Sequence, residues 1–312
     1  MKWTSTEVEQ LADLLERETQ VQVTPHASLA PLTSWKVGGS ADILARPDNV
    51  EQAERLLIFL QTRRWPWVVL GRGTNVLVPD AGIRGVVVHF NHLDTIEPGV
   101  DARYRAEAGA ALAELVRLSS SRGDSGIEDL AAIPGSVGGA VVMNAGAGEQ
   151  SLGDTVSAVK VVQGGEVRRL SGLELNFGYR CSGIRPDMVV LEVMLQLQRL
   201  DERQSIERRT AALAYRKQAQ KVDMPNAGSV FRNPPATAAW KLIDACGLRG
   251  FCIGGAQVSV RHANFIVNTG SASAADIADL IAHVQSEVMN KCGVKLKPEI
   301  RFLHREINFY ET

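Results

Sequence analysis

The chain contains 312 residues, which is enough for two domains or for one large domain with insertions. Lys and Arg number 34 against 35 Asp and Glu, and the resulting net charge of −1 excludes a general basic field that would attract nucleic acid or an anionic membrane. A hydrophobic content of 45% and a charged content of 22% exclude long disorder and predict a globular protein.

Helix and strand signals alternate through the first 200 residues. The capping-box pattern of Thr4 and Glu7 predicts a short amino-terminal helix. A second helix is predicted to begin after Asn49 and to end before Pro66, because proline disfavours helix in the residue that precedes it. Further predicted elements are strands over 67–70, 85–88 and 191–197, a helix over 111–122 and a hairpin of 156–162 with 166–170. Because apolar and polar residues alternate over 191–197, we expect one face of that strand to be buried and the other to be exposed.

A highly charged segment over 201–221 separates the two parts of the chain. Its composition predicts an exposed connecting helix and a domain junction. Beyond it, the pattern predicts a helix over 238–246, strands within 257–267, a helix capped by Ser273 and a strand over 299–303. This mixed order of elements predicts an α+β fold with two unequal domains that divide near residue 200.

Several classes of protein are disfavoured by absent signals. No apolar run approaches the ~20 residues that cross a bilayer, and the amino terminus lacks the apolar segment of a signal peptide. We therefore expect a cytoplasmic protein with neither a membrane nor a nucleic acid as partner. No CxxC or HExxH motif is present, so we predict no metal site and four reduced cysteines in the core, namely Cys181, Cys246, Cys252 and Cys292.

Glycine is concentrated in three short loops. The segment 133–139 reads Ile-Pro-Gly-Ser-Val-Gly-Gly, the segment 70–75 reads Leu-Gly-Arg-Gly-Thr-Asn, and two glycines follow Val37. One such loop alone is typical of a tight turn, but three together favour a bound diphosphate, because successive free amides can form an anion-binding concavity. The chain lacks a complete GxGxxG after a strand, a GxxxxGK[ST] and a GxSxG, which disfavours a Rossmann dinucleotide site, a P-loop and a serine hydrolase.

Eight short motifs follow one another over residues 34–300. They are Ser34-Trp-Lys-Val-Gly-Gly39, Gly71-Arg-Gly-Thr-Asn75, Ile133-Pro-Gly-Ser-Val-Gly-Gly-Ala140 with Met143-Asn-Ala-Gly146, Gly178-Tyr-Arg180, Gly228-Ser-Val-Phe-Arg-Asn-Pro234, Gly254-Gly-Ala256, His262-Ala-Asn-Phe-Ile-Val-Asn268 and Lys297-Pro-Glu299-Ile. In this order they resemble the UDP-N-acetylenolpyruvoylglucosamine reductase (MurB) family, in its shorter class without an extra tyrosine-bearing loop.

The resemblance implies both a fold and an activity. The fold is an FAD-binding domain of the vanillyl-alcohol-oxidase (PCMH) type over 1–200, with an amino-terminal helix and two α+β subdomains at about 20–90 and 91–200, followed by an α+β substrate-binding domain over 201–312. The activity is NADPH-dependent reduction of UDP-N-acetylglucosamine enolpyruvate to UDP-N-acetylmuramate through FAD. That reaction belongs to peptidoglycan precursor synthesis, and so to cell-wall biogenesis, cell shape, cell division and the cell cycle.

Site residues carry over from the matching motifs. The family's contacts to the cofactor diphosphate correspond to Gly71, Arg72, Gly73, Thr74, Asn75, Pro134, Gly135, Ser136, Gly139 and Ala140. Its catalytic set corresponds to Arg180, Ser229 and Glu299. Candidate donors to the diphosphate of the nucleotide substrate are Tyr215, Arg216, Lys217, Arg232 and Asn233. Because residues 126–175 contain neither His nor Cys, where this fold usually attaches flavin covalently, we expect non-covalent FAD with NADPH as co-substrate.

The reaction explains why these residue types are needed. Hydride addition to the β-carbon of an enolpyruvyl ether moves negative charge onto C2 and its carboxylate, which the guanidinium of Arg180 can hold bidentately. Ser229 is the expected proton donor to C2, because an enolate is a base strong enough to deprotonate an alcohol, and Glu299 is expected to shape the electrostatics there. Considered singly, Arg180 could pair with a structural carboxylate, Glu299 could be a solvated edge charge and Ser229 could be a turn serine.

Three positions depart from the family pattern. Gly148 stands where an aromatic residue is usual, Asp129 where glutamate is usual, and Thr74 where serine is usual, although Thr74 keeps the hydroxyl. Two other functions stay open at this point, namely another FAD-dependent oxidase or dehydrogenase of the same fold and a non-catalytic sugar-nucleotide-binding protein. The sequence predicts no oligomeric state and no role for the residues after Leu303.

Overall fold

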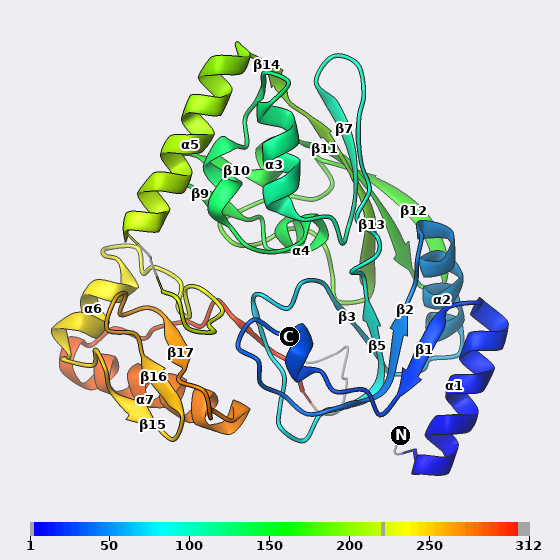
Figure 1. Ribbon diagram of the computed structural model, residues 1–312, viewed down its shortest axis with the longest axis horizontal. Coiled ribbons are helices and arrows are strands. Elements are labelled where there is room, and N and C mark those ends of the chain that lie inside the picture. Colours follow the sequence, from blue (N-terminus) through cyan, green and yellow to red (C-terminus); the bar gives the residue numbers. More distant parts are fainter. Residues whose placement is uncertain (1–2, 220–221, 305–312) are drawn as a thin grey trace.

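The computed structural model describes residues 3–219 and 222–304, which form three α+β units around a common centre (Figure 1). A four-stranded sheet of order β1-β2-β5-β3 builds the first unit, a five-stranded sheet of order β12-β11-β13-β7-β6 the second, and a three-stranded sheet of order β15-β16-β17 the third. No helix in the described part of the chain is long and apolar enough to cross a membrane. Of the residues after Leu303, to which the sequence assigns no role, 305–312 lie outside the described residues.

The first unit packs two helices against its sheet. Its elements are α1 (Ser5–Thr19), β1 (Gln22–Pro25), η1 (Ala30–Leu32), β2 (Ala41–Arg46), α2 (Val50–Thr62), β3 (Trp67–Leu70), β4 (Val76–Leu77) and β5 (Ile83–His89). Thr4 and Glu7 form the predicted capping box, and the side chain of Asn49 caps α2 by accepting from the backbone amide of Gln52. Strands β2, β5 and β3 run parallel and are buried, as their apolar sequences require.

The second unit is an antiparallel sheet covered by short helices. Its elements are β6 (Ile96–Pro98), β7 (Arg103–Glu107), α3 (Leu112–Ser120), β8 (Asp124–Ser125), η2 (Glu128–Ala132), α4 (Val137–Val142), β9 (Gly146–Ala147), β10 (Gln150–Ser151), η3 (Leu152–Asp154), β11 (Val156–Gln163), β12 (Glu166–Ser171), β13 (Met188–Gln196) and β14 (Gln198–Arg199). The predicted hairpin of β11 and β12 is confirmed, and its turn places both Gly164 and Gly165 at positive φ, which residues with a side chain rarely adopt.

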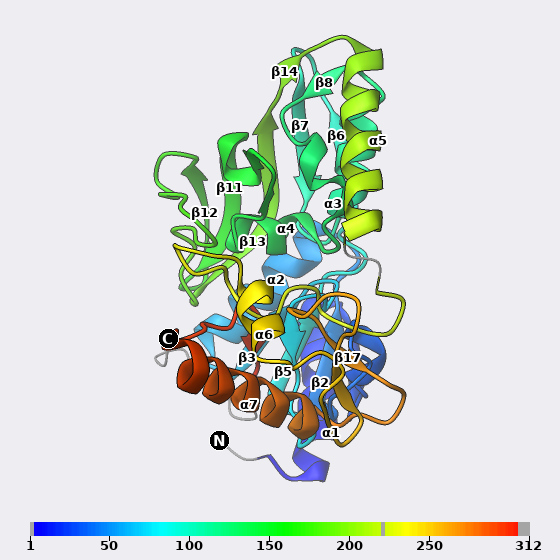
Figure 2. The same cartoon turned by 90° about the vertical axis from the view of Figure 1, so that its left-hand side faces the viewer.

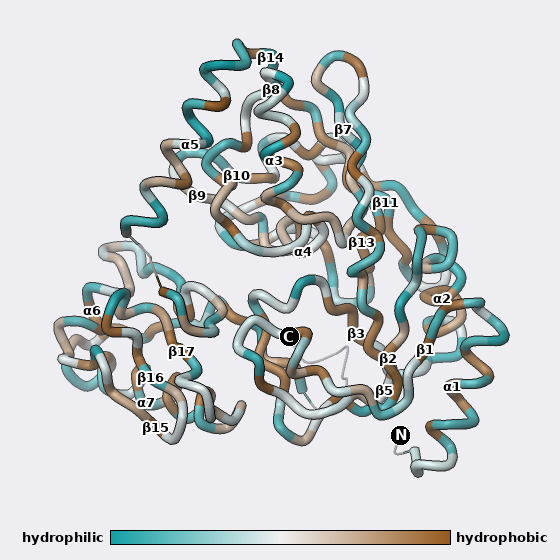
Figure 3. Tube along the Cα trace, viewed as in Figure 1, coloured by the Kyte–Doolittle hydropathy of each residue, from teal (hydrophilic) through white to brown (hydrophobic). Residues whose placement is uncertain are grey.

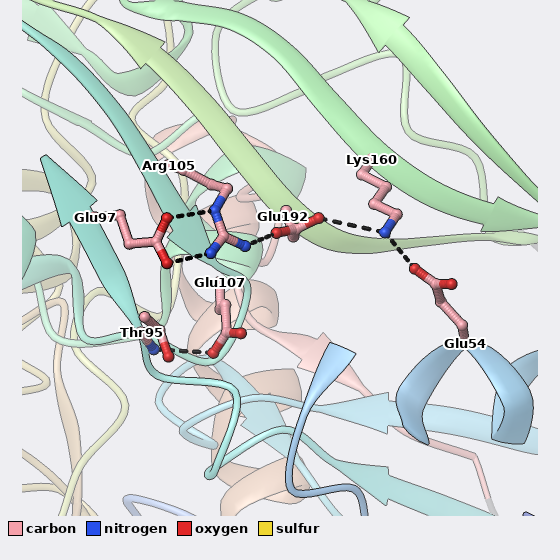
Figure 4. Close-up of polar contacts among 7 residues, drawn as sticks. All are labelled: Glu54, Thr95, Glu97, Arg105, Glu107, Lys160 and Glu192. Carbon is pink, nitrogen blue, oxygen red and sulfur yellow. Dashed lines mark hydrogen bonds and ion pairs between the residues drawn. The ribbon is translucent and has the colours of Figure 1, made fainter. Parts of the chain in front are cut away.

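Strand β13 differs from the prediction at Glu192. We expected this polar position to be exposed, but it is buried, like its apolar neighbours Leu191 and Val193. Two cations neutralise its carboxylate: Arg105 contacts one oxygen, and the Lys160 amine lies 3.5 Å from the other. Lys160 also pairs with Glu54 on α2, so the charged face of the second sheet is linked to a helix of the first unit (Figure 4). The predicted period-two pattern therefore fails at Glu192, because a neighbouring element covers this position, and it holds from Val193 to Gln196, where Gln196 is exposed.

Helix α5 (Glu202–Ala219) is the predicted charged helix. Its residues are mostly hydrophilic (Figure 3) and mostly exposed, yet it packs along η2 and α3 of the second unit (Figure 2). The hydroxyl of Ser205 donates to the buried carboxylate of Glu128 at 2.9 Å. The helix thus rests on the second unit along its first turns and leads the chain toward the third unit.

The third unit contains α6 (Ala239–Ala245), β15 (Cys252–Ile253), β16 (Ala256–Val258), β17 (Ile266–Asn268), α7 (Ala274–Cys292) and β18 (Arg301–Phe302). Ser273 caps α7 as predicted, and the carboxylate of Asp80 from the first unit also accepts the amides of Ala274 and Ala275 at 2.8 and 2.9 Å. Trp35 is fully buried in this unit, where its indole donates to the carbonyl of Ile266 at 2.8 Å.

The cysteines do not all lie in the core. Cys246 is buried and Cys292 is half-buried, whereas Cys181 and Cys252 are exposed. The prediction of core cysteines is therefore wrong for Cys181 and Cys252. Cys181 closes a turn with Gly178, whereas Cys252 begins β15, where its thiol donates to the carbonyl of Gly250.

Candidate functional site

A cavity of about 2140 Å³ lies where the three units meet. Its wall combines the glycine loops 70–75 and 133–140, the turn at 178–180, one face of α5, the segment 227–233 and residues within 299–304. Single-ligand sites typically occupy about 300–1,000 Å³, so this cavity has room for a large cofactor and a second nucleotide together. Two of the three glycine loops that the sequence singled out therefore line one cavity, whereas Gly38 and Gly39 of the third loop pack against residues 78–82.

The two main glycine loops face each other across the cavity. A Cβ on Gly71 would lie 2.5 Å from the hydroxyl oxygen of Ser136, and the Thr74 hydroxyl donates to the carbonyl of Pro134 at 3.2 Å. Gly139 is exposed toward the cavity, and a Cβ there would meet only the Ser136 hydroxyl, at 3.2 Å. The loops thus form a narrow cradle of backbone without side chains, which fits the diphosphate of FAD.

His89 lies beneath the first of these loops, at the end of β5. Its burial, together with the charge of Arg46, lowers the pKa of His89 to about 4, although a hydrogen bond to the Gly71 backbone opposes that shift. The imidazole is therefore neutral at physiological pH. It supports the loop without adding charge to the cradle, where Arg72 is the nearby cation.

Arg180 stands at the tip of a tight turn and points toward Glu299. The amide of Gly178 donates to the carbonyl of Cys181 at 3.0 Å and the amide of Cys181 donates back at 3.2 Å. Arg180 takes a left-handed backbone conformation with φ +56, and its Nε lies 2.7 Å from Glu299 Oε1. Its guanidinium carbon also lies 5.3 Å from the centre of the Tyr179 ring. About a fifth of each charged side chain is exposed, so the pair is accessible from the cavity.

Ser229 and Glu299 lie on adjacent backbone segments. The amide of Glu299 donates to the carbonyl of Val230 at 2.7 Å, which aligns the two segments antiparallel. Asn264 fixes the same segment, because its buried amide both accepts from and donates to the backbone of Phe231, at 3.0 and 2.8 Å. Ser229 follows Gly228, which has φ +73, and its hydroxyl makes no hydrogen bond to any other described residue. The three predicted catalytic residues are therefore brought together at one wall.

The predicted substrate residues are only partly brought to this cavity. Tyr215, Arg216 and Asn233 line it, whereas Lys217 and Arg232 are not among its lining residues. Burial and the charge of Arg180 lower the pKa of Arg216 from its usual value, and the carboxylate of Glu299 opposes that effect. Arg216 therefore adds a second guanidinium beside the Arg180–Glu299 pair.

Two departures from the family pattern are neighbours in space. Gly148 has φ +59, and a Cβ on it would lie 2.3 Å from Asp129 Oδ2. Asp129 also accepts from the amide of Glu149 at 3.4 Å. The carboxylate of Asp129 thus occupies the space that a side chain at 148 would need.

Sequence reasoning missed two residues at this site and gave a third a different contact. Arg208 lines the cavity from α5, and a solvated helix charge carries no signal that would distinguish it. Asn144 lies in the motif Met143-Asn-Ala-Gly146, where no role was assigned to it, and it bonds the turn that carries Arg180, through the carbonyl of Gly178 at 2.9 Å. Asn75 was predicted as a cofactor contact, but its side-chain amide donates to the backbone carbonyl of Glu299 at 3.2 Å. Among the described residues, no group of three His, Cys, Asp or Glu side chains could hold a metal ion.

Comparisons with known proteins match two parts of the chain to two family models. A family model described as "UDP-N-acetylenolpyruvoylglucosamine reductase, C-terminal domain" matches residues 220–303, and one described as "FAD binding domain" matches residues 41–171. The UDP-N-acetylenolpyruvoylglucosamine reductase of Syntrophotalea carbinolica is 42% identical over 86% of this chain and 90% of its own length. That of Trichlorobacter lovleyi is 43% identical over 89% of this chain and 92% of its own length.

A solved structure is also similar over almost its full length. The UDP-N-acetylenolpyruvylglucosamine reductase (MurB) of Thermus caldophilus aligns with a TM-score of 0.79 at 34% identity, over 91% of this chain and 99% of that chain. Together with the family models, this confirms the predicted α+β architecture of an FAD-binding domain followed by a carboxyl-terminal domain.

Proposed function

The chain belongs to the UDP-N-acetylenolpyruvoylglucosamine reductase family, and we propose that Arg180, Ser229 and Glu299 carry its reaction. The protein is an FAD-dependent oxidoreductase that uses NADPH to reduce UDP-N-acetylglucosamine enolpyruvate to UDP-N-acetylmuramate. The observation that carries the residue assignment is the meeting of these three side chains at the wall of a cavity that the glycine loops also line.

The glycine loops are the proposed cofactor site. Gly71 to Asn75 and Pro134 to Ala140 bring backbone with little side-chain cover to the cavity, which suits two phosphates bound at close range. In the second loop the amides of Val137, Gly138 and Ala140 already donate to carbonyls within the protein. FAD held there would supply the hydride that reduces the substrate, with NADPH as its reductant. The cavity is lined by the glycine loops and the catalytic residues together, so it has room for the cofactor and a second nucleotide.

Arg180 and Glu299 act together on the enolpyruvyl group. Hydride arrives at C3, and negative charge then develops at C2 and on the adjoining carboxylate. The guanidinium of Arg180 faces the cavity and remains charged, so it stabilises that negative charge without reorganisation. Glu299 orients the guanidinium through its 2.7 Å contact and keeps the local charge balanced.

Ser229 delivers the proton that completes the reduction. Its hydroxyl is free of other described partners and lines the same cavity, so it is available to a ligand. Transfer of its proton to C2 forms the new C–H bond, and the serine is reprotonated afterwards from water. An alcohol serves as acid here because the acceptor is an enolate carbon of high basicity.

Anionic parts of the substrate are bound from α5 and the third unit. Tyr215, Arg216 and Asn233 line the cavity and can donate to a diphosphate. Of these three, Arg216 interacts electrostatically with both Arg180 and Glu299. Lys217 and Arg232 stay predictions for this role, because they stand beside rather than on the described wall.

The domain boundary and the cellular setting are also proposals. A division into 1–200 and 201–312 places α5 with the substrate-binding part. Two observations favour a boundary at the carboxyl-terminal end of α5 instead: α5 packs on η2, and the carboxyl-terminal family model begins its match at residue 220. We place the enzyme in the cytoplasm, where its nucleotide substrates are, in the pathway that supplies cell-wall growth and cell division. Its partners are these small molecules rather than nucleic acid or membrane.

Spectroscopy of the purified protein tests the function. The protein should be yellow, should bleach under anaerobic NADPH, and should regain its colour when the UDP enolpyruvyl ether is added without oxygen. A protein that binds the nucleotide but does not bleach would be a non-catalytic binding protein. One that regains its colour only with oxygen would be an oxidase of the same fold.

A further inference from the structure

Asn144 connects three segments of the site through one side chain. It follows α4, is 7% exposed and has φ +41. Its Nδ2 donates to the carbonyl of Gly178 at 2.9 Å, and its Oδ1 accepts from the amide of Gly153 at 2.9 Å. Both ends of the amide are therefore used within the protein, and both partners are backbone groups of other loops.

The turn that Asn144 holds is the one that carries Arg180. Gly178 and Cys181 close this turn with two backbone hydrogen bonds, and Arg180 at its tip is left-handed, with φ +56. For a residue with a side chain this conformation is strained and persists only where surrounding contacts enforce it. On the far side of the turn, the Ser182 hydroxyl donates to the carbonyl of Val142 at 2.9 Å. Both ends of the turn are thus tied to the segment that leaves α4.

The second partner of Asn144 makes this connection rigid. A Cβ on Gly153 would lie 2.5 Å from the Phe177 ring and 2.8 Å from Asn144 Oδ1, so no side chain fits at that position. Phe177 directly precedes Gly178. Asn144 therefore sits in a closely packed space between 153 and 177–178, where a change of its rotamer would break both hydrogen bonds.

We propose that Asn144 is a positioning residue for Arg180, which holds the turn at 178–181 so that the guanidinium meets Glu299 and the substrate carboxylate. This inference rests on the proposed role of Arg180. Asn144 acts only through the turn, since both polar ends of its side chain are already bonded to backbone. A neutral amide suits the task, because it provides a donor and an acceptor without adding charge beside the Arg180–Glu299 pair.

The two half-reactions distinguish positioning from a general structural role. Arg180 stabilises charge that develops only when the enolpyruvyl ether is reduced, so NADPH bleaching does not depend on it. A displacement of about 1 Å can cost about 100-fold in rate. Asn144→Ala should therefore bleach with NADPH at close to the wild-type rate, and reoxidation by the UDP substrate should slow by roughly 10-fold to 100-fold.

Two further variants identify the bond that matters. Asn144→Asp keeps the acceptor for Gly153 but places a carboxylate oxygen against the carbonyl of Gly178, so it should slow reoxidation at least as much as Asn144→Ala. Asn49→Ala is the matched control, because it removes an asparagine that caps α2 far from the turn. It should lower the melting temperature and leave both half-reactions unchanged.

A double-mutant cycle with Arg180→Ala provides the decisive comparison. If Asn144 acts through Arg180, Asn144→Ala should add almost no further slowing to Arg180→Ala, because residues that act as a unit are not additive. In hydrogen exchange, the backbone of 176–183 should exchange faster in Asn144→Ala and remain protected in Asn49→Ala. Additive losses in the cycle, unchanged exchange, or loss of FAD from Asn144→Ala would each overturn the proposal. If Arg180→Ala itself reoxidises at the wild-type rate, the proposed function of Arg180 fails instead.

Discussion

Ser229→Ala separates chemistry from binding more cleanly than any other change in this site. The Ser229 hydroxyl makes no hydrogen bond to another described residue, so its removal breaks no contact within the fold. A substitution of this kind typically changes the free energy of unfolding by less than about 0.5 kcal/mol. The variant should therefore fold, bind FAD and appear yellow.

The magnitude follows from what the hydroxyl does in each step. As a ligand contact alone, it would contribute the net value of a hydrogen bond, about 0.5–1.5 kcal/mol, which is at most roughly tenfold in affinity. As a general acid, its removal should slow the proton-dependent step by about 10² to 10⁴, which corresponds to about 2.7–5.5 kcal/mol of barrier. NADPH bleaching requires no proton on carbon and should be close to wild type, whereas reoxidation by substrate should take the whole loss.

Stopped-flow absorbance of the flavin measures both steps on one sample. Ser157→Ala is a suitable control, because this exposed serine lies on β11, and its hydroxyl donates only to a backbone carbonyl, that of Met194. If reoxidation of Ser229→Ala slows by less than about tenfold, the loss is that of an ordinary hydrogen bond and the proton comes from another group. Glu299, on the adjacent segment, is then the first to test.

Three other outcomes are expected. Gly139→Val should fold but lack FAD, because a Cβ there meets only the Ser136 hydroxyl inside the protein and otherwise fills the cradle; a flavin absorbance equal to wild type would contradict this. FAD should be released into the supernatant by acid precipitation, and colour that stays with the pellet would show a covalent bond. For Glu128, burial alone would raise the pKa, but hydrogen bonds from Ser125, Gly126 and Gln150 lower it to about 2, so its carboxylate stabilises the fold above pH ~4.5 and loses that effect as the pH falls. The wild-type free energy of unfolding, measured in urea, should thus exceed that of Glu128→Gln by most at pH 7, and this difference should be about 2 kcal/mol smaller at pH 3. A difference that does not change with pH would refute the assignment.

The sequence predicted best those features that short segments determine by themselves. The capping boxes at Thr4 and Ser273 and the hairpin at Gly164-Gly165 depend on residues three or four positions apart, and all three are present. Glu192 shows the opposite case. Its burial depends on Arg105 of β7 and on Lys160 of β11, and Lys160 itself pairs with Glu54 on α2. No pattern within β13 contains that information.

The same distinction applies to the candidate site. The motifs predicted that Arg180, Ser229 and Glu299 belong to one site, and the structure brings them to one wall. It could not be predicted that Asn75 supports Glu299, because the contact spans 224 positions and joins a loop of the first unit to the last strand. Nor could the relation of Gly148 to Asp129 be read from the sequence, where each appears only as an isolated departure.

Neutral amides recur wherever this site must be held in place. Asn144 ties the turn of Arg180, Asn75 ties the backbone of Glu299, and Asn264 ties the segment beside Ser229. Each catalytic group comes from a different loop, so each needs a connection that spans loops, and an amide can donate to one backbone segment while it accepts from another. A charged side chain in the same place would change the balance of the 2.7 Å Arg180–Glu299 pair, on which the proposed stabilisation of negative charge at C2 depends. The glycine motifs of this chain therefore serve two ends at once: their glycines leave room for the cofactor, and their asparagines hold the groups that act on the substrate.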